Sequence, residues 1–298
     1  MYLTGFADEA AGDLAGQIRA TQALGWTRIE SRNIDGENIH DLSEEAFDRA
    51  CGQLRDAGIS INCFGSAIAN WGKDIRKPFD ADLEQARRAL IRMRRLGCRM
   101  IRIMSYAVLS DRRPGDQMED ERFRRVRELT RIFLDAGIQP VHENCMNYGG
   151  MGAAFTLRLI ENVPGLKLVF DTGNPIFSAD RARPEPCPNQ SPWEFYDQVR
   201  EHIAYIHIKD GYVRDGKTVY TWPGEGVGDV VCICNDLLAN GYDGGFSIEP
   251  HLGAVYHDPS ITLEADRRFA MYVGYGRRME RILAAARTAA ALAAARAP

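Results

Sequence analysis

The chain has 298 residues, of which 45% are hydrophobic and 26% are charged, and its formal net charge is −4. This length and composition suit one large domain or two small ones with a sizeable core, and they exclude a disordered chain. The weakly acidic balance, without a large basic block in the main body, argues against nucleic acid as the main ligand.

The N-terminus and the cysteines indicate where the protein works. The opening sequence "MYLTGFADEA" has neither the basic nor the apolar region of a signal peptide. No apolar run approaches the roughly 20 residues that a membrane helix needs. The seven cysteines are scattered and form no CxxC pair, which predicts free thiols in a reducing compartment. We therefore expect a cytoplasmic protein with no membrane partner.

Short β-rich runs alternate with helical patterns along the whole chain. The candidate strands are 2–7, 28–31, 59–65, 100–105, 139–144, 167–172, 204–210 and 245–250. Apolar residues at three- and four-residue spacing predict helices between the first strands, at 10–26, 43–58, 79–97 and 120–137. Glycines at the ends of these segments suit the left-handed conformation that closes many helices.

This alternation predicts parallel βα units, and eight of them in fewer than 300 residues favour a single (β/α)8 TIM barrel, an α/β fold, over residues 1–285. A doubly wound open sheet is the alternative, but no glycine-rich phosphate turn follows the first strand. The alanine-rich residues 286–298 are predicted to form a helix-prone tail with little to bury.

The loops after the strands are longer than those after the helices, which suits a barrel whose C-terminal face carries the site. The segment 211–228 predicts a small hairpin that turns at Asp215 and Gly216. The proline-rich residues 180–192 suit neither helix nor strand, and they could cover the site or contact a second subunit.

The last four strands each carry a potential metal ligand at or near the end: Glu143, Asp171, His207 and Glu249. A lone carboxylate there would more often cap a helix, and a lone histidine would more often pack in the core. In a barrel, however, consecutive strand ends surround one mouth, and carboxylates that close would repel one another without a cation. Three carboxylates and one imidazole suit Mn²⁺, Mg²⁺ or Co²⁺, with Zn²⁺ also possible.

Several motifs fall in this order along the chain: "HEN" (142–144), "FDTGNP" (170–175), "HIKD" (207–210), "PGEG" (223–226) and "GYDGGFSIEP" (241–250). They resemble the sugar phosphate isomerase/epimerase superfamily, a xylose-isomerase-like TIM-barrel group that includes ketose 3-epimerases, inosose dehydratase-like enzymes and endonuclease IV. The resemblance covers about residues 1–285. It implies one divalent metal ion, Mn²⁺ before Mg²⁺, Co²⁺ or Zn²⁺, bound by Glu143, Asp171, His207 and Glu249. Relatives are often homodimers or homotetramers, and the sequence leaves the oligomeric state of this chain open.

Further residues are predicted to contact a small-molecule sugar at the mouth. The resemblance indicates Glu30, because many relatives have a substrate-binding glutamate at the end of the second strand. Strand alternation places Lys209 on the face of His207, and His251 on the face of Glu249. The remaining candidates are Arg102 on the fourth strand, Asn174 after Asp171, and Trp71, which could stack on a sugar ring or only pack.

Such a site supports enolisation of a sugar, with a metal-stabilised enediolate and with Glu143 and Glu249 as acid and base. We therefore predict a sugar isomerase or epimerase. The alternatives are a lyase or dehydratase acting on a keto-sugar or keto-inositol, and a non-catalytic sugar-binding barrel.

Ketose 3-epimerases usually carry a histidine three residues after the metal aspartate and an arginine six residues after the metal histidine. Asn174 and Val213 stand at these two positions instead, and Arg214 follows Val213. The two departures from the epimerase pattern leave room for the lyase.

Overall fold

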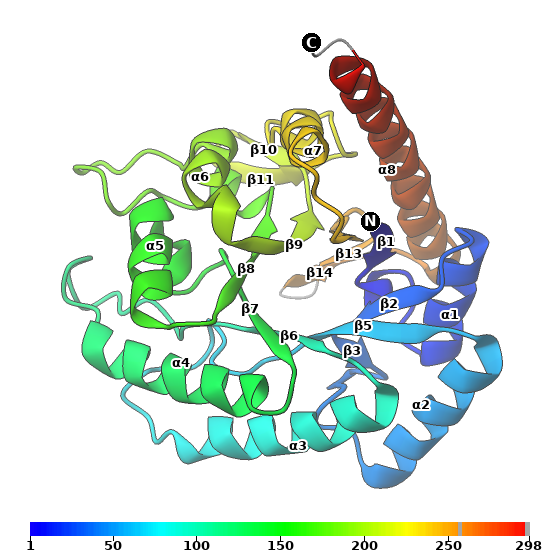
Figure 1. The fold of residues 1–298 in the computed structure, drawn as a ribbon, viewed down its shortest axis with the longest axis horizontal. Coiled ribbons are helices and arrows are strands. Elements are labelled where there is room, and N and C mark those ends of the chain that lie inside the picture. Colours follow the sequence, from blue (N-terminus) through cyan, green and yellow to red (C-terminus); the bar gives the residue numbers. More distant parts are fainter. Residues whose placement is uncertain (256–257, 296–298) are drawn as a thin grey trace.

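Eight parallel strands form one sheet that curls into a nearly closed barrel in this computed structural model, which describes residues 1–255 and 258–295 (Figure 1). The strands are β1 (Tyr2–Gly5), β2 (Arg28–Ser31), β5 (Ser60–Gly65), β6 (Met100–Ile103), β7 (Gln139–Glu143), β8 (Lys167–Asp171), β9 (Ile203–Ile208) and β12 (Gly245–Ile248). Their order around the sheet is β1-β12-β9-β8-β7-β6-β5-β2. A parallel bridge between Phe6 and Glu30 joins the two ends of this order. The predicted TIM barrel and its eight strands are confirmed.

Helices surround the barrel and connect its strands (Figure 1). They are α1 (Leu14–Ala23), α2 (Glu44–Ala57), α3 (Asp80–Leu96), α4 (Glu119–Leu134), α5 (Ala153–Asn162), α6 (Pro192–Val199), α7 (Val230–Ala239) and α8 (Ala265–Ala294). The Ser43 hydroxyl accepts a hydrogen bond from the Ala46 amide and caps α2. Gly58 and Gly97 end α2 and α3 in the left-handed conformation. The helical periodicity therefore located these elements to within a few residues.

The loops above the strand ends carry the smaller elements. Hairpins are formed by β3 (Asn33–Ile34) with β4 (Glu37–Asn38), β10 (Gly211–Arg214) with β11 (Lys217–Tyr220), and β13 (Ala254–Val255) with β14 (Asp258–Thr262). The second hairpin turns at Asp215 and Gly216, both at positive φ, as predicted. Short 3-10 turns lie there at Ala7–Glu9, Gly149–Met151 and Asn174–Phe177, and a further one, Arg200–His202, connects α6 to the start of β9.

The inside of the barrel is filled beneath the mouth by a small cluster, Cys63, Val141, Val169 and Tyr205, that is separate from the larger core between sheet and helices. Side chains alternate between the two faces of a strand, so inward-facing positions recur every second residue. The next inward positions along β7, β8 and β9 are Glu143, Asp171 and His207. The packed interior is thus a floor that supports these polar side chains.

The C-terminal helix α8 continues without a break through residue 285. Leu283 and Ala286 are buried, whereas Leu292 is 55% exposed, so the helix leaves the body of the protein near its end (Figure 1). Neither α8 nor any other described helix combines the length and apolar character needed to cross a membrane. All seven cysteines are free, as expected.

Candidate metal centre

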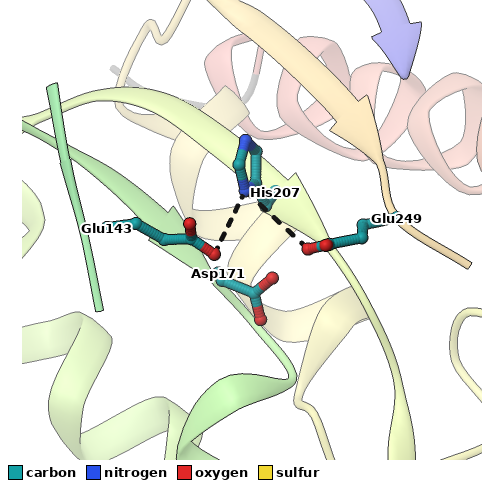
Figure 2. A group of neighbouring side chains, drawn as sticks. All are labelled: Glu143, Asp171, His207 and Glu249. Carbon is teal, nitrogen blue, oxygen red and sulfur yellow. Dashed lines mark ion pairs between the residues drawn. The ribbon is translucent and has the colours of Figure 1, made fainter. Parts of the chain in front are cut away.

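Glu143, Asp171, His207 and Glu249 point toward one another from four neighbouring strand ends (Figure 2). Each offers one ligand atom, and these four atoms all lie within 4.8 Å of one another. All four side chains are buried. The structure therefore brings together the four residues that the sequence spacing singled out, and this cluster could hold a metal ion.

Two atoms of this cluster fit a cation because neither makes a hydrogen bond, although the Lys209 ammonium forms an ion pair with one of them, Asp171 Oδ2. His207 Nδ1 and Asp171 Oδ2 are both buried, and neither has a hydrogen-bond partner. His207 Nδ1 lies 3.6 Å from Glu143 Oε1 and 4.0 Å from Glu249 Oε2, so it faces the centre of the group. Buried polar atoms are almost always paired, and a hard-to-borderline dication would satisfy both of these atoms. The donor set thus fits a divalent metal.

His207 is held in this orientation by Glu30. Its Nε2 lies 3.1 and 3.0 Å from the two Glu30 carboxylate oxygens, and the Ser247 hydroxyl donates to Glu30 at 2.6 Å. Burial lowers the pKa of His207, but Glu30 and Glu143 outweigh burial and raise it to about 10. A carboxylate on one ring nitrogen directs the other nitrogen toward a metal. Glu30 lies behind His207, and it does not line the cavity formed by the described residues.

Glu143 is held by an arginine and an amide. Arg102 Nη1 donates to Glu143 Oε2 at 2.8 Å, and Asn174 Nδ2 donates to Oε1 at 3.1 Å. Burial alone would raise the pKa of Glu143, but Arg102 and His207 lower it to about 2. The carboxylate is therefore ionised at neutral pH, with Oε1 directed toward the centre.

Asp171 ends β8 at a tight turn that fixes one of its oxygens. The Gly173 and Asn174 amides donate to Oδ1 at 2.8 and 2.7 Å, which leaves Oδ2 for the centre. Lys209 Nζ lies 3.1 Å from Oδ2. Burial raises the pKa of Asp171 to about 6; Lys209 opposes this rise, and the neighbouring glutamates add to it.

Glu249 is held by two cations. Arg32 Nη1 donates to Oε1, and Lys209 Nζ donates to Oε2, both at 3.0 Å. Burial raises the pKa of Glu249, but Lys209, His251 and Arg32 together hold it well below its usual range. Burial likewise lowers the pKa of Lys209, whereas Asp171 and Glu249 raise it well above its ordinary value. Lys209 is thus a charged donor beside the cluster.

The sequence interpretation missed the group that holds Glu249 from the N-terminal side. Arg32 makes two hydrogen bonds with the Asp8 carboxylate, at 2.9 and 3.1 Å, while its guanidinium carbon lies 4.4 Å from the centre of the Phe6 ring. His251 Nδ1 lies 2.9 Å from Glu9 Oε1. These residues follow β1 and β2, and only barrel closure brings them beside β12, so no local motif marks them.

A cavity opens above the cluster. Among the predicted substrate contacts, it is lined by Trp71, Arg102, Asn174, Lys209 and His251. Glu143 and Glu249 also line it, whereas Asp171 and His207 are fully buried beneath it. The segment 180–192 contributes no described residue to the lining. Arg214 is exposed on the hairpin, over the ring of Tyr212, and it is absent from the lining as well.

Comparison with known proteins places this barrel in a family. The family model described as xylose isomerase-like TIM barrel matches residues 18–269. The chain belongs to the xylose isomerase-like TIM barrel family. No curated protein sequence gives a significant match.

Solved structures that share the fold of this xylose isomerase-like barrel are distant in sequence. An L-ribulose 3-epimerase is 19% identical, with a TM-score of 0.67 over 99% of this chain and 98% of the other. A probable 3-DHS dehydratase, AsbF from Bacillus anthracis, is 16% identical, with a TM-score of 0.64 over 91% and 97%. A xylose isomerase-like TIM barrel protein from Mycobacterium smegmatis, in complex with magnesium, is 18% identical, with a TM-score of 0.68 over 96% and 97%. The neighbours thus include an epimerase and a dehydratase.

Proposed function

We propose that the protein is a divalent-metal-dependent sugar isomerase or epimerase in which Glu143 and Glu249 are the acid and base. The observation that carries this proposal is the convergence of four ligand atoms within 4.8 Å, two of them buried and without hydrogen-bond partners. Glu143, Asp171, His207 and Glu249 would hold the metal. Mn²⁺ is our first choice, and the magnesium complex of a structural neighbour supports a hard divalent ion.

The two glutamates approach the centre from opposite sides, because β8 and β9 lie between β7 and β12. A bound dication supplies Lewis-acid polarisation of a substrate carbonyl, which acidifies the neighbouring C–H group. Glu143 and Glu249 are both ionised at neutral pH, so either can accept the proton from this carbon and then return it; the other glutamate delivers a proton to the opposite face only after it has taken one from water. Return to the opposite face gives the epimer, and return to the adjacent carbon gives the isomer.

The remaining lining residues are proposed to bind and orient the sugar. Lys209 Nζ is a charged donor that lies 3.0 Å from Glu249 Oε2, so it suits a substrate oxygen bound beside that carboxylate. Arg102 and Asn174 fix the two oxygens of Glu143 and thereby its direction of approach. Trp71 lies at the cavity wall, where its ring offers an apolar surface to the substrate.

A lyase or dehydratase is the second candidate, and Asn174 favours it. The amide of Asn174 occupies the position where the resemblance to ketose 3-epimerases calls for histidine, and an amide cannot carry a proton near neutral pH. Arg214 packs over the Tyr212 ring on the hairpin and does not line the cavity, so it does not replace the expected arginine. The dehydratase among the structural neighbours agrees with this candidate.

One experiment tests both candidates. The Mn²⁺-loaded protein is incubated in D₂O with a panel of ketoses and keto-sugar derivatives, and the products are followed by NMR and mass spectrometry. One deuterium incorporated without any other change of formula supports the isomerase or epimerase. Loss of water or of an aglycone supports the lyase. Full activity in protein stripped of metal would overturn both.

A further inference from the structure

The cavity above the candidate metal centre has two unlike walls. We propose that the wall formed after β5, β6 and β7 binds an apolar group, so that the substrate is a sugar carrying an alkyl or aryl substituent. This inference rests on the proposed function, because it assumes that the sugar itself occupies the metal centre. The wall is made by Trp71, Met104, Cys145 and Met146, which we call the apolar wall.

The apolar wall is continuous because its parts follow neighbouring strands. Trp71 lies in the loop after β5, Met104 directly follows β6, and Cys145 and Met146 follow β7, and these three strands are adjacent in the sheet (Figure 1). Cys145 Sγ lies 3.6 Å from Met104 Sδ. Four charged lining residues, Arg32, Lys209, Glu249 and His251, follow β2, β9 and β12 instead. Two more, Arg102 and Glu143, lie on β6 and β7, but they pair with each other at 2.8 Å beside the metal centre. Beyond that pair, a ligand in the cavity meets sulfur and indole on this side and charged groups on the other.

Met146 stands at the outer end of this wall and is 51% exposed. Its loop cannot easily turn it inward, since the fully buried Asn147 donates to the Glu143 carbonyl at 3.0 Å and accepts from Ser105 at 2.7 Å. The loop also packs against Gly150, where an added Cβ would lie 1.6 Å from the Cys145 carbonyl oxygen. A single exposed methionine needs no explanation, but one that is fixed next to a cavity and continuous with Met104 and Cys145 marks a binding surface.

The chemistry of the apolar wall suits a hydrocarbon group better than hydroxyl groups. Thioethers and thiols are weak hydrogen-bond partners. Hydroxyl groups placed against them would lose their hydrogen bonds to water and gain only weak ones to sulfur. The polar neighbours on this side are engaged: the Ser66 hydroxyl donates to the Arg102 carbonyl, and Asn70 Oδ1 accepts from the Gly72 amide at 3.0 Å. Methionine also adapts to different apolar shapes. An alkyl or aryl substituent on the sugar would cover this wall.

The test compares methyl and hexyl β-D-glucopyranoside binding to the Mn²⁺-loaded protein by isothermal titration calorimetry. Each fully buried methylene strengthens binding about fourfold, so we expect hexyl glucoside to bind at least about tenfold more tightly than methyl glucoside. In Met146→Ser and Trp71→Ser this ratio should fall to within about threefold. The matched control is Ile91→Ser, because Ile91 is 59% exposed on α3 and outside the cavity; its ratio should equal that of the wild type.

Equal affinities for the two glucosides, or a ratio that both cavity variants retain, would overturn the proposal. The absence of saturable binding of hexyl glucoside would overturn the proposal as well. Met146 is half exposed, so its replacement leaves the fold intact, and circular dichroism of each variant verifies this. The affinity ratio does not depend on turnover, whereas the proposed function is read from deuterium incorporation. Failure of the one is thus distinguishable from failure of the other.

Discussion

The two halves of the barrel contribute to the candidate centre in different ways. Strands β7, β8, β9 and β12 each place one potential ligand at the mouth, and three of these four are acids. Strands β1, β2 and β6, with the segments directly after them, place the groups that hold those ligands: Asp8, Glu30, Arg32 and Arg102. The ligand half thus supplies the donor atoms, and the partner half fixes where they point, together with Asn174 and Lys209 of the ligand half.

This division explains how so many acids can be buried together. Each glutamate of the ligand half has an arginine from the partner half, Arg102 for Glu143 and Arg32 for Glu249, and both guanidinium groups lie over the Phe6 ring. The arginines offset much of the acidic charge in the absence of a cation. The two atoms without a hydrogen bond, His207 Nδ1 and Asp171 Oδ2, belong to the two central ligands. Replacing residues in each half separately tests whether the division holds.

The largest effect is expected in the ligand half. Glu143→Gln keeps the shape and one oxygen ligand but cannot accept a proton, so metal-dependent incorporation of deuterium into substrate should fall about 10²- to 10⁴-fold. The rate is measured by NMR with Mn²⁺ at saturation, and metal content verifies that the site is still loaded. Glu201→Gln, at a side chain that is 89% exposed, is the control and should match the wild type. A Glu143→Gln protein with an unchanged rate would remove Glu143 from the chemistry.

In the partner half, Arg32→Met should act mainly on stability. Arg32 is 4% exposed and contacts Asp8, Glu9 and Glu249, so its loss leaves buried carboxylates uncompensated. We expect the free energy of unfolding of the metal-free protein to fall by about 3–5 kcal/mol, measured by urea denaturation. Arg55→Met is the control: its pair with Asp56 is exposed, so it should cost at most about 1 kcal/mol. Equal effects of the two variants would show that Arg32 does not balance the acids.

Glu30→Gln should weaken metal binding without removing a ligand. The neutral amide cannot hold His207 as the Glu30 carboxylate does, so the dissociation constant for Mn²⁺ should rise about 10- to 100-fold. Calorimetric titration of the metal-free protein measures this constant, with Glu201→Gln again as the exposed control. If Glu30 instead bound substrate, as the family resemblance had suggested, the variant would raise the KM of substrate and leave the metal affinity unchanged.

The sequence revealed the ligand half more readily than the partner half, for a physical reason. Glu143, Asp171 and His207 stand on successive strands, so alternation and βα spacing alone place them at one mouth. Arg32 contacts both Asp8 and Glu249 only when β1 pairs with β12 and with the end of β2, and no local pattern records that contact. Glu30 was visible at a strand end, but spacing could not show that it lies behind His207 and not in the cavity.

The last expected effect is a pH dependence of metal affinity that joins the two halves. In the metal-free protein, Glu30 and Glu143 outweigh burial and raise the pKa of His207 to about 10, while burial raises the pKa of Asp171 to about 6. A metal ion must displace the proton on His207 at any pH below about 10, so Mn²⁺ affinity should increase about tenfold per pH unit between pH 7 and 9. Below pH 6 a second proton, on Asp171, makes the dependence steeper. Titrations in buffers of different ionisation enthalpy count the released protons.

In Glu30→Gln the carboxylate that raises the pKa of His207 is gone, so the slope between pH 7 and 9 should flatten. A wild-type affinity that does not change over this range would mean that His207 is already neutral, and that the partner half does not control its proton.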